Sequence, residues 1–200
     1  MGHIRFWLVF VAACVAEPAM PQGSTTHIEV NGKFAFTFLA DGNTNGQLTA
    51  SRDLITNVKT LDFAYVIPDP TNPDLVTFIQ GAGTIPNNSF QVSHSTAELH
   101  VTTPFPVTSC LSNTSTGEMT CSASPPIRFD LSWVRDGFFI QRETTESRTT
   151  FGPVTTRFEG TLKRWSAVVN GSWTDHAASN INGELQDTEN TTVTREITEP

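Results

Sequence analysis

Residues 127–140, with the sequence IRFDLSWVRDGFFI, decide the fold class of this chain. The apolar residues Phe129, Leu131 and Trp133 alternate with three polar ones. Side chains of a strand point alternately to opposite faces, so this pattern predicts a strand with one buried face. Asp136 followed by Gly137 predicts a two-residue hairpin turn, which would pair Val134 with Phe139.

Similar alternation recurs along the chain. Phe34, Phe36 and Phe38 share one predicted face with Ile28 and Val30, and Thr37 falls on the other, polar face. A loop around Asn31 and Gly32 would keep the apolar residues of this segment together. Further segments are centred on Phe63 and Leu99. Apolar residues change phase between Leu162 and Trp165, which predicts a β-bulge at Lys163 and Arg164.

Composition agrees with a strand-rich protein. The 200 residues include 30 threonines and 14 phenylalanines, and only 16% of residues are charged. No segment predicts a convincing helix. We expect an all-β chain, a single antiparallel β-barrel-like meander or β-sandwich of about 9–11 strands. The net charge of -8 argues against a nucleic-acid-binding surface.

The first residues predict export. Residues 1–5 carry a positive charge, and residues 6–13 are apolar but too few to span a bilayer, as in a signal peptide. Cleavage after Ala16 would leave residues 17–24 as a short tether. Alternatively, residues 11–14, VAAC, resemble the lipobox of bacterial lipoproteins. That resemblance implies a signal ending at residue 13 and lipidation of Cys14, which would anchor the protein to a membrane.

The two remaining cysteines predict a disulfide. Cys110 and Cys121 flank the polar segment LSNTSTGEMT, and exported proteins favour oxidation. We therefore expect residues 25–200 to form a single β domain, with a disulfide-stapled loop at 102–126. Whether the mature protein is freely secreted or anchored to the cell envelope stays open.

The sequence contains no strong catalytic motif, and three weaker groups remain. His94, Glu98 and His100 share a strand face and could contribute to a metal site. The hairpin at Gly137 would place Asp130 opposite Glu143, where paired carboxylates could shift a pKa or hold a cation.

The third group comprises Trp133, Trp165 and Trp173. Their alternation with polar residues favours places in the core, whereas exposed rings could stack on sugars.

These patterns favour a non-enzymatic protein that binds a small ligand in a barrel or cleft, with no cofactor. The alternative is an adhesion or carbohydrate-binding β-sandwich that recognises an extracellular glycan through surface loops and exposed aromatic rings. A hydrolase with a dispersed site is the third possibility. The first two differ in whether the interior is a lined cavity or a filled core with aromatic rings outside.

Overall fold

The computed structural model describes residues 25–41, 44–151 and 154–196, and every regular element in them is a strand. The eleven strands are β1 (Thr25–Asp41), β2 (Thr44–Asp53), β3 (Lys59–Pro68), β4 (Leu75–Ile85), β5 (Phe90–Val92), β6 (Thr96–Thr102), β7 (Val107–Asn113), β8 (Met119–Ser124), β9 (Arg128–Phe151), β10 (Val154–Trp173) and β11 (His176–Glu196).

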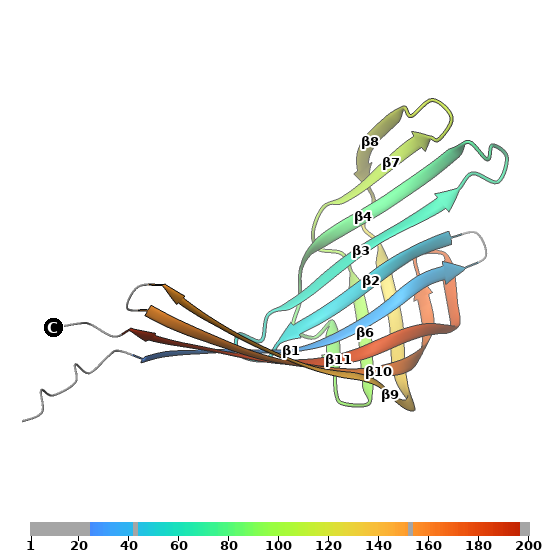
Figure 1. Cartoon of the computed structure of the whole chain (residues 1–200). Helices are drawn as coiled ribbons and strands as arrows, with labels where there is room; N and C mark the ends of the chain where they lie inside the picture. Colours follow the sequence, from blue (N-terminus) through green and yellow to red (C-terminus); the bar gives the residue numbers. More distant parts are fainter. Residues whose placement is uncertain (1–24, 42–43, 152–153, 197–200) are drawn as a thin grey trace, which may run out of the picture.

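All eleven strands belong to one antiparallel sheet, in the order β5-β6-β9-β10-β11-β1-β2-β3-β4-β7-β8. The expected all-β antiparallel class is therefore confirmed. The sheet does not close into a barrel, because β5 and β8 remain as its two edges. Instead it coils until β6 and the first half of β9 lie behind β1–β3 (Figure 1).

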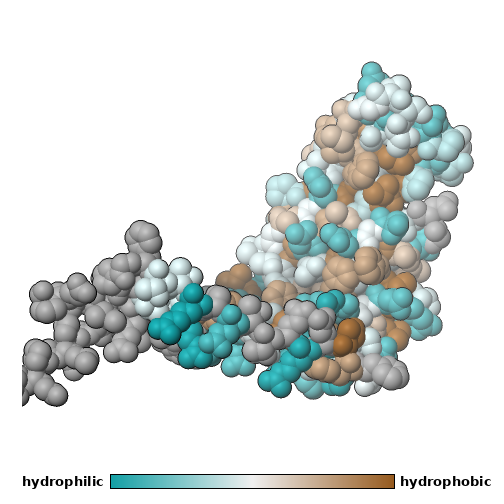
Figure 2. Space-filling model, viewed as in Figure 1, coloured by the Kyte–Doolittle hydropathy of each residue, from teal (hydrophilic) through white to brown (hydrophobic). Residues whose placement is uncertain are grey.

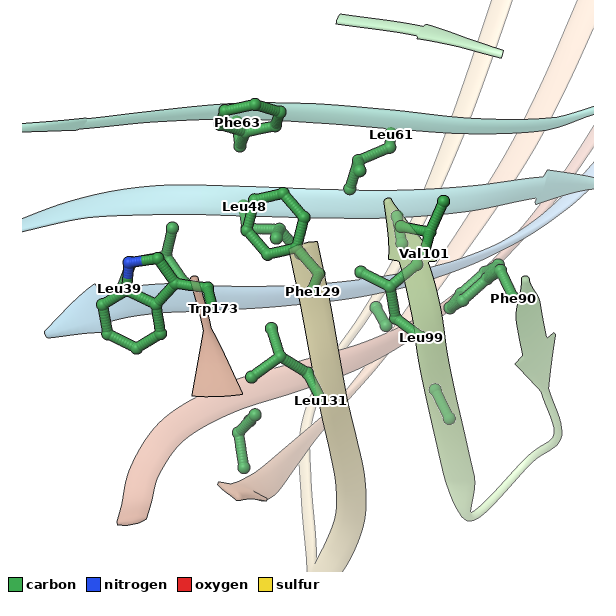
Figure 3. Close-up of a cluster of buried hydrophobic side chains, with 14 of the residues drawn as sticks. Leu39, Leu48, Leu61, Phe63, Phe90, Leu99, Val101, Phe129, Leu131 and Trp173 are labelled. Atoms are coloured by element: carbon green, nitrogen blue, oxygen red, sulfur yellow. The ribbon is translucent and has the colours of Figure 1, made fainter. Parts of the chain in front are cut away.

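The core lies between these two parts of the same sheet. In Figure 3, side chains from β1–β3 meet side chains from β5, β6 and β9, whose ribbons run across them. The rings of Phe63 in β3 and Phe129 in β9 lie 4.8 Å apart. The largest fully buried side chains are Trp133, Trp173, Phe63, Phe90 and Phe129. We call the face of the sheet that carries this core the inner face, and the opposite one the outer face.

A buried lysine links β3 to β5. The Lys59 ammonium donates hydrogen bonds to the carbonyl oxygens of Asn87 and Phe90, and so joins β3 to the segment that leads into β5. Only 6% of Lys59 is exposed. Burial lowers the pKa of Lys59, and the charge of Arg52 lowers it further.

The expected orientation of β1 is wrong at residues 34–39. Ala35, Thr37 and Leu39 are fully buried on the inner face, whereas Phe38 is 55% exposed on the outer face. Small inner residues are required because Trp133 packs over this part of β1, and its indole N–H donates to the Phe36 carbonyl oxygen at 3.0 Å.

Thr37 can be buried because its hydroxyl donates to the carbonyl oxygen of Asn182 at 2.8 Å. Gly183, the next residue of β11 after Asn182, also leaves room for the Trp133 ring, since a Cβ there would lie 2.9 Å from it. The face of β1 that hydropathy alone assigns to solvent is therefore buried, and it carries Ala35, the hydrogen-bonded Thr37 and Leu39.

The expected hairpin at Asp136 and Gly137 is also wrong. Strand β9 runs through both residues from Arg128 to Phe151. Its pairing with β10 shifts register twice, so that residues 136–138 lie opposite the single residue Ser166. Gly137 has a φ of 96°, which glycine adopts readily. The two residues therefore belong to an irregular bulge, in which three residues of β9 oppose one of β10, rather than to a turn.

The apolar residues of β10 change phase between Leu162 and Trp165, as predicted, but the cause is not a bulge in β10. Pairing of β10 with β11 is regular from Leu162 to Val169, so Leu162 lies on the outer face and Trp165 on the inner face. The extra residues that shift the register belong to β9. Asn31 and Gly32 likewise form no turn, since β1 passes through them.

The disulfide between Cys110 and Cys121 is present, with directly opposite partners in the β7–β8 hairpin. The segment expected as a stapled loop therefore contains two strands, both of which extend the sheet beyond β4.

Beyond the core, four strands continue as a single layer that we call the arm, seen projecting to the left in Figure 1. The arm comprises residues 25–31 of β1, 141–151 of β9, 154–164 of β10 and 187–196 of β11. Lys33 and Asp187 form a 3.2 Å ion pair where the arm joins the core.

Candidate ligand-binding groove

An open groove of about 730 Å³ lies on the outer face of β1–β4. Strand pairing builds it from two adjacent rows of side chains. One row runs across the four strands as Phe38, Gln47, Ala64 and Gln80, and the next includes Asn45, Val66 and Phe78. Brown, hydrophobic residues occupy the part of Figure 2 where β3 and β4 lie in Figure 1.

Two phenylalanines stand at opposite sides of this groove. Phe38 lies in β1 and Phe78 in β4, and they are 55% and 42% exposed. Three inter-strand spacings separate their strands, about 14 Å at the usual spacing. The Phe36 ring contacts Phe38 edge-on, with ring centroids 5.1 Å apart, and so supports it.

The groove between the rings is uncharged. Its lining residues include no Asp, Glu, Lys, Arg or His, and its exposed polar side chains are the amides of Asn45, Gln47 and Gln80. Each amide can both donate and accept hydrogen bonds. The arrangement therefore suits a neutral ligand that has apolar faces and many hydroxyl or amide groups.

The structure separates the three residues considered for metal binding. Glu98 and His100 are neighbours on the exposed face of β6, 3.9 Å apart, and His100 lies 2.7 Å from Asp130 of β9. His94 lies instead in the turn before β6, where its ring contacts Trp165 and its Nε2 is 3.2 Å from Arg135. Within the described ranges, no three His, Cys, Asp or Glu side chains could hold a metal ion.

The predicted pairing of Asp130 with Glu143 is wrong, because it depended on the hairpin. Asp130 lies opposite His100 of β6 and Ser172 of β10, whereas Glu143 lies opposite Leu162 in the arm. The two residues are thirteen positions apart along the same strand, about 40 Å of extended chain. Asp130 has Arg128 at 4.0 Å as well as His100, in an exposed ion-pair network.

All three tryptophans considered for ligand stacking are buried. Trp133 and Trp173 are fully buried and Trp165 is 4% exposed. Arg135 covers the Trp165 ring at 5.3 Å in a cation–π contact. Among the described side chains, the large exposed rings are those of Phe38, Phe139 and Phe78. The alternation that could have indicated Phe38 was interpreted as a core face.

A second polar cluster, which the sequence did not indicate, joins the β1–β2 and β10–β11 turns. His176 stacks on Trp173, with ring centroids 5.3 Å apart, and its Nδ1 lies 3.4 Å from both Asp41 Oδ2 and Thr44 Oγ1. Both polar contacts use the same ring nitrogen and link the β10–β11 turn to the β1–β2 turn.

Tyr65 borders this cluster, with its ring 6.3 Å from that of His176. Burial raises the pKa of Tyr65 to about 12, although a hydrogen bond with Thr174 opposes the shift. The Tyr65 side chain is therefore a neutral, buried member of the core.

Cys14 and the expected signal peptide lie outside the described residues. None of the described elements is a helix with the length and hydropathy needed to cross a membrane. Comparisons with protein-family models, with curated proteins and with solved structures find no match for this chain.

Proposed function

We propose that this protein is a non-enzymatic binding protein that holds a neutral oligosaccharide in the groove on the outer face of β1–β4. The observation that carries the proposal is the lining of that groove: two exposed phenylalanine rings, Phe38 and Phe78, with three exposed amides between them and no charged side chain.

The chemistry of a sugar matches this lining. A pyranose ring has a face of C–H groups, which packs on an aromatic ring, and a rim of hydroxyl groups, which pair with amides. Asn45, Gln47 and Gln80 supply such amides. The separation of about 14 Å between the two aromatic strands suits a chain of sugars more than a single ring.

The filled core favours a surface site over an enclosed one. Large side chains, including Trp133 and Trp173, occupy the space between the two parts of the sheet. A small apolar ligand bound inside the protein would have to displace them, at the cost of their packing. Recognition by exposed aromatic rings needs no such rearrangement.

Export is part of the proposal. Residues 1–16 resemble a signal peptide, and the Cys110–Cys121 disulfide suits an oxidising compartment. We propose that the mature protein is secreted or, if Cys14 is lipidated, held at the cell envelope, where glycans are accessible.

The test is titration calorimetry with a panel of neutral oligosaccharides of glucose, mannose, galactose and N-acetylglucosamine. We expect one member to bind, and Phe38→Ala and Phe78→Ala each to weaken its binding at least about tenfold, a loss of about 1.4 kcal/mol. Phe139→Ala is the matched control, because Phe139 is 50% exposed and does not line the groove.

Three outcomes would contradict the proposal. The first is no binding by any member of the panel. The second is an equal loss of affinity on Phe139→Ala. The third is groove-dependent binding of a fatty acid instead of a sugar, which would keep the groove as a site but change the ligand class.

A further inference from the structure

We propose that a second copy of this chain pairs with the free edge of β9 in the arm, making a two-fold symmetric dimer with one continuous sheet. The reason for this proposal is an edge of the arm that has no neighbouring strand among the described ones. In the described part of the chain, residues 141–151 of β9 pair only with β10. Their other edge presents unpaired backbone N–H and C=O groups along about 36 Å.

The arm has the form of an interaction element rather than of a self-sufficient sheet. It extends from the core as a single layer of four strands (Figure 1). An isolated small sheet gains little stability unless one face is buried or its edges are paired. Continuing the sheet into a second arm would supply hydrogen bonds to the free edge of each.

The edge of β9 carries charged side chains, but it lacks the lysine, the proline and the bulge that also prevent pairing of edge strands. Residues 141–151, QRETTESRTTF, contain no proline, glycine or lysine and include four threonines, which favour extended chain. The bulge that would disturb pairing lies before this segment, at residues 136–140. The other free edge of the arm, residues 25–31 of β1, is shorter, since β2 pairs with β1 only from Gly32 onward. The terminal strands of the sheet are shorter as well: β5 has three residues and β8 has six.

Charges along the edge select the register. Arg142, Glu146 and Arg148 are exposed and lie on the same face of β9, since their numbers share one parity. Antiparallel pairing of identical strands places residues of the same parity opposite each other. With Ser147 on the two-fold axis, Glu146 of each copy lies opposite Arg148 of the other, which gives two ion pairs. Within its own copy Glu146 also pairs with Arg157 of β10 at 3.2 Å, so its carboxylate would be shared between the two arginines.

Neighbouring registers are less favourable. An axis at residue 146 or 148 places like charges, Glu146 or Arg148, opposite each other, and an axis at residue 145 places Arg142 opposite Arg148. An axis at residue 144 pairs Arg142 with Glu146 but extends into the bulge. The axis at Ser147 pairs residues 143–151, which lie in the regular part of β9.

Cross-linking tests this register directly. All samples are full chains with Cys14→Ser, so that an introduced cysteine is the only free thiol beside the native disulfide. Ser147→Cys should form a disulfide-linked dimer on mild oxidation, because directly opposite Cα atoms in antiparallel strands are 4.5–5.5 Å apart. Glu143→Cys, expected to lie opposite Phe151 of the other copy, is the matched control and should cross-link far more slowly.

Charge reversal followed by sedimentation velocity supplies the second readout. The unaltered chain should show a concentration-dependent doubling of mass. Glu146→Arg should give monomers, and Glu146→Arg combined with Arg148→Glu should restore the dimer. Circular dichroism and the intact Cys110–Cys121 disulfide would show that each variant is folded. Monomers at every concentration, equal cross-linking through residues 143 and 147, or no rescue by the double reversal would overturn the proposal.

Discussion

Substitutions at two adjacent residues of β1 test which face of this strand is buried. Leu39 is fully buried on the inner face and Phe38 is 55% exposed on the outer face. Leu39→Ala should therefore destabilise the protein much more than Phe38→Ala, even though phenylalanine is the larger side chain. The opposite ranking is expected if the phenylalanines of this strand face the core.

The magnitudes follow from burial. Truncation of a fully buried leucine removes its transfer free energy and leaves a cavity, which together cost about 2–5 kcal/mol. Complete burial of a phenylalanine contributes about 1.5–3 kcal/mol. Because more than half of Phe38 is exposed, its truncation should cost about 1 kcal/mol, including its edge contact with Phe36.

Urea unfolding monitored by tryptophan fluorescence would measure both changes, since Trp133, Trp165 and Trp173 are buried in the folded state. Unchanged m-values would show that each variant unfolds from the same fold to the same ensemble. A larger loss for Phe38→Ala than for Leu39→Ala would refute the assignment of faces. It would also remove Phe38 from the proposed groove.

Three further predictions address the core, the disulfide and the strand packing. Tyr65 is the only tyrosine in the chain, so its absorbance should show ionisation near pH 12 when folded and near pH 10 when unfolded. Because the unfolded state loses its phenolic proton first, the free energy of unfolding should fall by about 3 kcal/mol between those pH values, and Tyr65→Phe should abolish this contribution. Replacing Cys110 and Cys121 with serine should lower the free energy of unfolding by about 3 kcal/mol, measured in urea. Gly183→Ala should lower it by about 1–3 kcal/mol in the same assay, because the added Cβ would clash with Val169 Cγ2; an unchanged midpoint would contradict that packing.

Local alternation was sufficient for much of the fold. It identified the strands around Phe63, Leu99 and Phe129, each of which is buried as expected. These strands have one apolar and one polar face, so period two carries the information directly. The spacing of Cys110 and Cys121 was likewise sufficient for the disulfide, because one pair of cysteines outside the predicted signal segment leaves one pairing.

Turns were predicted less well. Asp136 and Gly137 have the residue types of a hairpin turn, yet they form a bulge in a strand of 24 residues. Glycine with positive φ serves both structures. The choice depends on whether the flanking strands pair with each other or with distant neighbours, and β9 pairs with β6 and β10 instead.

The sequence by itself determined the strand composition, the disulfide and the signal-like start of the chain. Only the tertiary structure decided which face of β1 is buried, because that depends on Trp133, almost 100 residues away in sequence, whose indole donates to the Phe36 carbonyl and requires small neighbours. The same crossing of β9 over β1 turns Phe38 outward and creates the groove with Phe78. Local hydropathy records how apolar a face is, whereas burial depends on which distant strand covers it.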